Sequence, residues 1–217
     1  MREFYRLEII NYDDSNFAFC DLPEDTKTAD SYPSCPYCPK CGASIGRRYW
    51  LEPRKVILSK PKYGDFVSGQ RYLVSERFKY AYEKSDLKGI KEFIPVEISK
   101  VRYMKQNSPL PPQYYALDLE RSYARIDHEK SCISWAMKTQ DPKRVCELCN
   151  PVGAVTTSIK GIYIDDTNWR GEDIFHLHEM GSSVFASQKF VNFCFEQEFT
   201  NFNYINTKDY IHPRVFT

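Results

Sequence analysis

Alternating apolar and polar residues predict strands along much of this chain. Near the N-terminus, Tyr5, Leu7 and Ile9 alternate with Arg6 and Glu8, which is the period of a strand with one buried face. The same reasoning predicts strands at 55–58, 93–104 and 115–119, and a segment at 122–127 that pairs with the last of them as a hairpin.

A strand that leads into a helix is predicted in the first half of the chain. β-prone residues precede Ser75, whose hydroxyl suits a helix N-cap. The helix is expected to run to about Leu87, with Gly89 stopping it, because glycine adopts the left-handed conformation that ends helices. Asp65, and Asp173 in the second half, are expected to be turn or cap residues.

The second half of the chain repeats this plan. A shift of 112 residues places Ser75 on Ser187 and Gly89 on Asn201. Asparagine follows glycine in its tolerance of a left-handed backbone. We therefore predict a second strand–helix–strand unit whose helix is capped by Ser187. The pattern indicates an internal duplication.

Two cysteine knuckles, far apart in the chain, carry the clearest chemistry. CPKCG at 38–42 and CELCN at 146–150 share the Cys-x-x-Cys spacing that turns two thiolates toward one metal ion. The glycine and the asparagine that follow suit the left-handed turn of such a knuckle. Together the pairs supply the four ligands of a closed tetrahedral zinc site, namely Cys38, Cys41, Cys146 and Cys149.

These patterns predict an α+β fold. It has two related strand–helix–strand halves, at about 35–106 and 146–207, joined by a structural zinc at the knuckle pair. The whole chain, 1–217, is expected to be a single zinc-clamped domain. The zinc is expected to be structural, because four thiolates leave no open coordination position.

The other cysteines leave one alternative open. Cys35 forms a second, overlapping pair with Cys38, so Cys35 is an alternative ligand to Cys38 or Cys41. We favour the pair that precedes the glycine. Small buried residues of the core, rather than ligands, are expected at Cys20, Cys132 and Cys194.

Composition excludes several classes of protein. The 217 residues are 42% hydrophobic and 15% aromatic, which is typical of a globular protein. A net charge of +1 argues against a broad surface for polyanions. We expect neither a signal peptide nor a membrane-spanning segment, because no apolar run is long enough. The cysteines are therefore expected to be reduced, metal-binding thiols of a cytoplasmic protein.

Several motifs together resemble those of the double-CXXCG motif family of bacterial immunity proteins. They are CPKCG at 38–42, LVSERF at 73–78, LKGIKEFIPV at 87–96, CELCN at 146–150, GEDIF at 171–175, VFASQKF at 184–190 and FNYI at 202–205. The EDIF and SQKF elements are also similar to another group of polymorphic-toxin immunity proteins. One departure from the family pattern is Asn150, which stands in place of glycine.

The resemblance implies a non-enzymatic protein that binds and neutralises a cognate toxin by occlusion. A metal-clamped scaffold suits this role, because a pre-organised surface lowers the cost of ordering on binding. The candidate partner-binding surface is an acidic loop with Asp165, Asp166 and Trp169, since aromatic residues dominate interface energies and acids suit a basic toxin. The alternative for this loop is a solvated turn with Trp169 folded inward.

The main alternative function is a zinc-ribbon protein that binds nucleic acid. Basic residues mixed with aromatic ones suit single strands, but the nearly neutral net charge argues against this class. A metal-dependent enzyme is not expected, because it needs an open coordination position. The basic residues of the nucleic-acid alternative follow the start of the first knuckle, and Tyr49 and Trp50 lie between them in the sequence. They are Lys40, Arg47, Arg48, Arg54, Lys55, Lys60 and Lys62.

Overall fold

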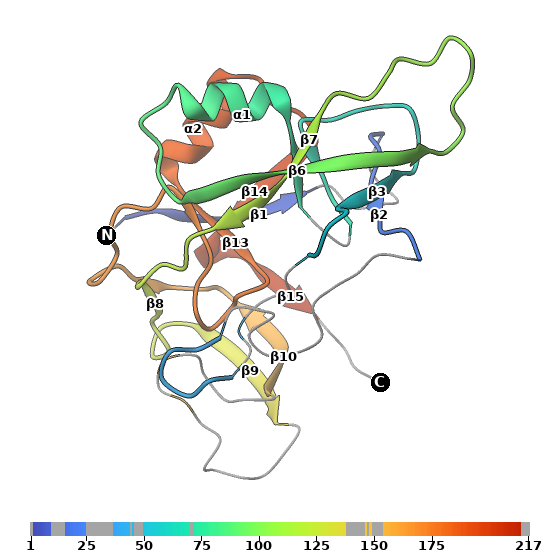
Figure 1. Ribbon diagram of the computed structural model, residues 1–217. Helices are drawn as coiled ribbons and strands as arrows, with labels where there is room; N and C mark the ends of the chain where they lie inside the picture. The colour runs from blue at the N-terminus through green and yellow to red at the C-terminus, as the bar shows by residue number, and fades with distance from the viewer. Residues whose placement is uncertain are drawn as a thin grey trace.

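Most of this structure is β-sheet, with two α-helices in the residues that it describes (Figure 1). The computed structural model describes residues 2–9, 16–24, 37–43, 45, 50–69, 72–137, 146, 148 and 154–213. The chain therefore has a mixed fold of helices and sheets, as its sequence patterns predict.

Two sheets form the upper part of the molecule as drawn in Figure 1. The larger has the order β2 (Cys20–Asp21), β3 (Lys55–Leu58), β6 (Ile90–Val101), β7 (Tyr114–Leu119), β5 (Leu73–Ser75) and β4 (Phe66–Val67). The second has the order β12 (Ile174–Phe175), β13 (Val184–Ser187), β1 (Phe4–Ile9) and β14 (Phe202–Asn206).

Two smaller sheets complete the described strands. One has the order β15 (Ile211–Pro213), β10 (Ala154–Lys160) and β9 (Cys132–Met137), and the other pairs β11 (Ile164–Asp165) with β8 (Arg125–Ile126). A short 3₁₀ helix, η2 (Thr207–Asp209), connects β14 to β15.

The two main sheets contain the same four-strand arrangement. The order β4-β5-β7-β6 in the larger sheet corresponds to β12-β13-β1-β14 in the second. Their registers also agree, because Phe66 pairs with Val74 and Ile174 pairs with Ala186. The third strand has a different origin in each, since β1 is the N-terminal strand whereas β7 follows β6 in the chain.

Each unit carries one helix that starts where its sequence predicts. Helix α1 (Glu76–Glu83) is capped by the Ser75 hydroxyl, which accepts a hydrogen bond from the N–H of Phe78 at 3.2 Å. Helix α2 (Gln188–Glu196) is capped in the same way by Ser187. Both predicted caps are confirmed, because a cap is a local feature that sequence spacing reveals.

The predicted end of the first helix is wrong by about one turn. Helix α1 stops at Glu83 rather than near Leu87. The reason is Ser85, whose backbone N–H and hydroxyl both donate to the Tyr82 carbonyl, at 3.0 and 2.7 Å, and so offer it a non-helical partner. Gly89 has a φ of +118° and leads into β6, so it turns the chain after the helix has already ended.

The predicted hairpin at 122–127 is also wrong. Strand β7 pairs with β6 and β5, and the following segment turns away, with the Ser122 N–H donating to the His176 carbonyl at 2.9 Å. Strand β8 then pairs with β11. Strand β6 also starts and ends three residues earlier than the predicted 93–104.

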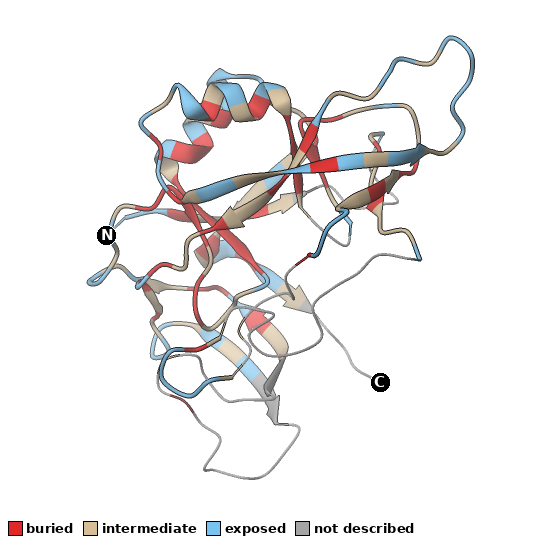
Figure 2. Cartoon of the chain, viewed as in Figure 1, coloured by how far each residue is buried: buried red, intermediate tan, exposed pale blue. Residues whose placement is uncertain are grey.

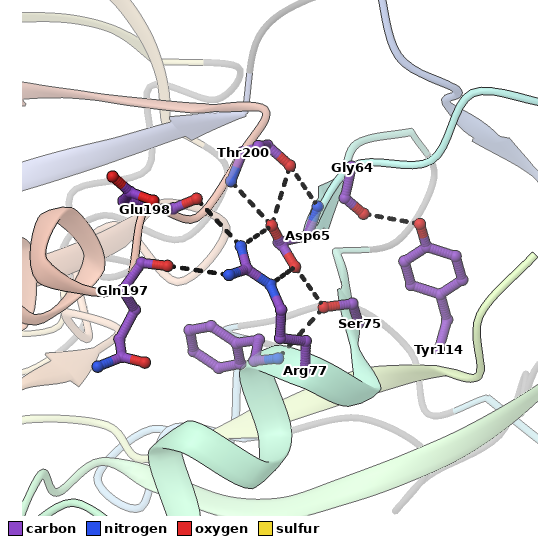
Figure 3. A network of polar contacts seen from close by, with 9 residues as sticks. Gly64, Asp65, Ser75, Arg77, Tyr114, Gln197, Glu198 and Thr200 are labelled. Atoms are coloured by element: carbon purple, nitrogen blue, oxygen red, sulfur yellow. Dashed lines mark hydrogen bonds and ion pairs between the residues drawn. The ribbon is translucent and has the colours of Figure 1, made fainter.

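Asp65 links the two units through a network of hydrogen bonds (Figure 3). Its carboxylate accepts from the Ser75 hydroxyl at 2.7 Å, from Arg77 at 2.6 Å and from the Thr200 N–H at 3.0 Å. Arg77 also donates to the carbonyls of Gln197 and Glu198, both at 3.0 Å. Asp65 therefore holds the segment that follows α2 against the start of α1.

Asp173 makes the reciprocal connection. Its carboxylate accepts from the Ser187 hydroxyl at 2.7 Å and from the Lys88 N–H at 3.0 Å. Lys88 precedes Thr200 by 112 residues, so each aspartate holds the chain after the other unit's helix. Each aspartate accepts a hydrogen bond from a capping serine and does not cap a helix itself. The two residues were expected to be turn or cap residues, and the structure instead shows them one step behind the cap.

The main core lies between the helices and the two sheets. Aromatic rings from both units meet there, since the Phe78 ring lies 6.2 Å from Phe190 and 5.1 Å from Phe199. Figure 2 shows buried residues in the strands beneath the helices, whose outer faces are exposed. The two helices therefore pack side by side over a shared interior.

Candidate metal centre and partner surfaces

The first cysteine knuckle has the backbone turn that its sequence predicts. The Gly42 N–H donates to the Cys38 carbonyl, and the Cys38 N–H donates to the Ala43 carbonyl, both at 2.8 Å. Gly42 has a φ of +71°, which is the left-handed conformation that favours glycine. This turn brings Cys41 back toward Cys38.

A cysteine from the second knuckle lies beside the first. The sulfur atoms of Cys38, Cys41 and Cys146 are all within 4.8 Å of one another. Cys38 and Cys146 are separated by 108 residues in the chain, yet their Sγ atoms are 3.7 Å apart. Both are buried, whereas Cys41 is exposed. Segments from opposite halves of the chain therefore meet at this cluster.

The separation of the sulfur atoms suits a metal ion better than a disulfide. A disulfide needs sulfur atoms about 2.05 Å apart. Four thiolates about 2.3 Å from a tetrahedral zinc ion lie about 3.8 Å from one another, which is close to the 3.7 Å between Cys38 and Cys146. The donor set, all sulfur, also suits zinc.

The remaining cysteines have mixed outcomes. Cys149 and Cys35 lie outside the described residues, so the fourth ligand and the alternative pair stay predictions. Cys20 and Cys194 are fully buried, as expected of core residues, and burial raises the pKa of the Cys194 thiol. Cys132 is exposed on β9, so its expected place in the core is wrong.

The acidic loop is held by contacts within the chain. Hydrogen bonds from Thr167 lower the pKa of Asp165, and Asp166 pairs with Arg2 at 3.2 Å. The Trp169 ring packs edge-on against Phe4, with 5.5 Å between the ring centroids. Its Nε1–H donates to a backbone carbonyl at 3.1 Å. The loop thus presents Asp165 to solvent, while Trp169 is partly buried.

The basic stretch after the first knuckle does not form an open cationic face where it is described. Arg54 pairs with Glu52 at 2.5 Å and Lys55 with Glu97 at 3.7 Å. Trp50 is buried, so its ring is not presented for stacking. These contacts give the nucleic-acid alternative no specific support. The part of the basic stretch at residues 46–49 lies outside the described residues.

One exposed feature was missed by the sequence reasoning. The loop that joins β6 to β7 carries Tyr103, Met104 and Leu110, and Tyr103 and Leu110 are 82% and 80% exposed. The signal for it was the three prolines within residues 109–112, which we interpreted only as a break between strands. Among the described helices, none is long and apolar enough to cross a membrane.

Comparison with known proteins identifies the class of this chain. The immunity protein family Imm11 matches residues 47–209. The match begins after the first knuckle and includes the second. It supports an immunity protein family and does not test the resemblance to the double-CXXCG family. No curated protein matches the chain. Because the match covers most of the 217 residues, the chain belongs to the immunity protein family Imm11.

Proposed function

We propose that this protein binds a cognate bacterial toxin and neutralises it by occlusion, covering the active site of the toxin or the path of its substrate. The observation that carries this proposal is the family match over residues 47–209. Family membership implies a toxin as partner in general, and neutralisation by binding requires no chemistry from the immunity protein itself.

A role without catalysis fits the hydroxyl groups of the two units. Ser75 and Ser187 each donate to an aspartate and accept from a helix N–H. Both hydroxyls are buried and serve to start a helix, so neither is presented as a nucleophile. This use of the two side chains agrees with their expected role as helix caps.

We also propose that zinc holds this scaffold through Cys38, Cys41, Cys146 and Cys149. The cluster of three sulfur atoms supports the first three ligands, and the spacing of the second knuckle supports the fourth. A bound ion would clamp two distant segments of the chain and keep the toxin-binding surface pre-organised. The resemblance to the double-CXXCG family rests on the same two knuckles.

The two strand–helix–strand units are proposed to derive from an internal duplication within a single domain. Their strand orders, registers, capping serines and aspartates correspond. The reciprocal aspartate contacts favour one folding unit, because neither half completes its own network. The acidic loop with Asp165, Asp166 and Trp169 stays a proposed contact surface, in which Asp165 would act as a rim charge that steers association.

The function is tested with a toxin sought among the reading frames that neighbour the gene for this protein. We expect co-expression of this protein to restore the growth of cells that produce the toxin. In vitro, we expect the two purified proteins to form a complex and the activity of the toxin to fall to zero at a 1:1 ratio. Full toxin activity in the presence of a molar excess of this protein would refute neutralisation by binding.

A further inference from the structure

The loop between β6 and β7 projects from the body of the molecule and exposes large apolar side chains. We call residues 100–112 the arm, which consists of the last two residues of β6 and the extended loop at the upper right of Figure 1. Tyr103 and Leu110 are more than three-quarters exposed, and Met104 is 42% exposed. Exposed large apolar side chains that lie within a few residues of one another on a projecting loop are typical of interaction sites.

The arm is held in one conformation by hydrogen bonds to the body and within itself. The Tyr63 hydroxyl donates to the Pro109 carbonyl at 3.0 Å. The Arg102 N–H donates to a β3 carbonyl at 2.8 Å, and its guanidinium pairs with Asp21 at 2.8 Å. Lys105 and Ser108 close the tip through two hydrogen bonds. Because the loop is already ordered, little entropy is lost when it binds a partner.

The backbone at Tyr103 is unusual for an aromatic residue. Tyr103 has a φ of +56° without being glycine, and such conformations persist where the surrounding structure enforces them. Here the enforced backbone turns the most exposed aromatic ring of the described residues toward solvent. A strained turn that presents an aromatic anchor is more consistent with recognition than with a simple connection.

The arm is also positively charged. Lys100, Arg102 and Lys105 lie on it, and no acidic residue occurs between Glu97 and Asp118. Among the ion pairs of the described residues, none includes Lys100 or Lys105. This segment differs from the whole chain, whose net charge is only +1. A surface that complements the arm must therefore be acidic.

The apolar residues of the arm favour a protein partner over a nucleic acid. Leu110 stands between Pro109 and Pro111, which offers an aliphatic side chain on a stiff backbone. Proteins that bind single-stranded nucleic acid combine basic side chains with several aromatic rings on which bases stack, whereas the arm has one aromatic ring, that of Tyr103. An aromatic and an aliphatic anchor surrounded by charges are typical of the centre of a protein interface.

We propose that the arm inserts into an apolar pocket rimmed by acidic side chains on the cognate toxin. Tyr103 and Leu110 are the anchors, and Lys100 and Lys105 contact the acidic rim. This inference rests on the proposed function, because it assigns the toxin-binding element of the same protein. It also gives the toxin a charge opposite to that expected for a partner of the acidic loop.

The proposal is tested by measuring the affinity of the purified cognate toxin for variants of the full chain. Tyr103→Ala and Leu110→Ala are each expected to weaken binding, raising the dissociation constant at least about tenfold. The matched controls are Tyr80→Ala on α1 and Ile211→Ala on β15, which remove exposed residues outside the arm and are expected to bind like wild type. Unchanged melting temperatures verify that each variant folds.

The charge is tested separately with the double variant Lys100→Glu and Lys105→Glu. Its association rate is expected to fall at low salt, with a weaker dependence on ionic strength than that of wild type. Arm variants with wild-type affinity would overturn the assignment of the arm, and loss of binding in Asp165→Ala instead would favour the acidic loop. A wild-type chain that fails to bind the toxin would overturn the proposed function and the assignment together.

A nucleic-acid partner gives a different pattern. If the charge variant loses binding to single-stranded RNA in a gel shift but keeps wild-type affinity for the toxin, the arm serves RNA and the proposal is wrong. If neither wild type nor variant shifts the RNA and only toxin binding weakens, the arm serves the toxin.

Discussion

At the scale of single residues, Asp65 shows how a buried charge can hold distant segments together. Burial alone would raise the pKa of this carboxyl, but hydrogen bonds from Arg77, Ser75 and Thr200 outweigh burial and leave the pKa below its usual value. The side chain of Asp65 is 9% exposed, so these bonds are little screened by water. Asp65 is therefore expected to stabilise the fold most when it is ionised.

The first prediction concerns the acid sensitivity of this network. The pKa of Asp65 is lower in the folded state than the unfolded value of about 3.9. Its stabilisation is therefore complete above about pH 4 and is lost as the pH falls through the folded pKa. Asp65→Asn should lower the free energy of unfolding by about 2 kcal/mol at pH 7 and by less at pH 3, as measured by urea denaturation.

The control for this prediction is Asp118→Asn, which alters a carboxylate on β7 outside the network. It should leave the free energy of unfolding within about 0.5 kcal/mol of wild type at both pH values. An equal loss for Asp65→Asn at pH 7 and pH 3 would show that the ionised carboxylate is not what stabilises the fold.

At the scale of the elements, the segments that follow the two helices turn through left-handed residues. Gly89 and Asn201 occupy matching positions, with φ of +118° and +65°. They differ in their surroundings, because a Cβ at Gly89 would lie 1.8 Å from the carbonyl oxygen of Ile174. The first unit can thus accept only glycine where the second accepts asparagine.

The second prediction follows from that close approach. Gly89→Ala should lower the free energy of unfolding by about 2–4 kcal/mol, because both the backbone conformation and the contact with Ile174 oppose a side chain. The matched control is Gly171→Ala, since Gly171 has a φ of +91° but no atom within 4 Å of an added Cβ. It should cost only about 1 kcal/mol, from the backbone alone. Equal losses in thermal or urea unfolding would contradict the steric explanation.

The elements also show what the sequence could and could not predict. Helix starts at Ser75 and Ser187 were predictable because a cap depends on residues three positions apart. The pairing of β1 between β13 and β14 was not, since it joins the N-terminus to residues near the other end of the chain. Strand patterns fix which face of a strand is buried but not which strand lies beside it.

In the candidate site, too, the local features were predictable from the sequence and the contacts between distant segments were not. Cysteine spacing within each knuckle indicated ligands, and the structure brings Cys146 to Cys38 and Cys41. The partner surface depends on exposure, which composition does not reveal. Trp169 in a polar loop is packed against Phe4, whereas Tyr103 in a loop of similar polarity is exposed. Only the contacts of each ring distinguish the two.

At the scale of the whole molecule, the proposed zinc ion and the two aspartates connect the same two halves at different places. Asp65 and Asp173 each bind the segment that follows the helix of the other unit. The cysteine cluster ties the segment at 37–43 to Cys146, across 108 residues of chain. A zinc clamp that closed so long a loop would restrict the unfolded chain strongly.

The most direct test of this account is the zinc content of the purified chain, measured by inductively coupled plasma mass spectrometry. We predict one zinc ion per chain for wild type and for Cys132→Ser, which alters an exposed cysteine outside the cluster. Cys41→Ser and Cys146→Ser should contain far less than one. A wild-type chain purified without zinc, or serine variants that retain a full ion, would contradict a metal centre shared by the two knuckles.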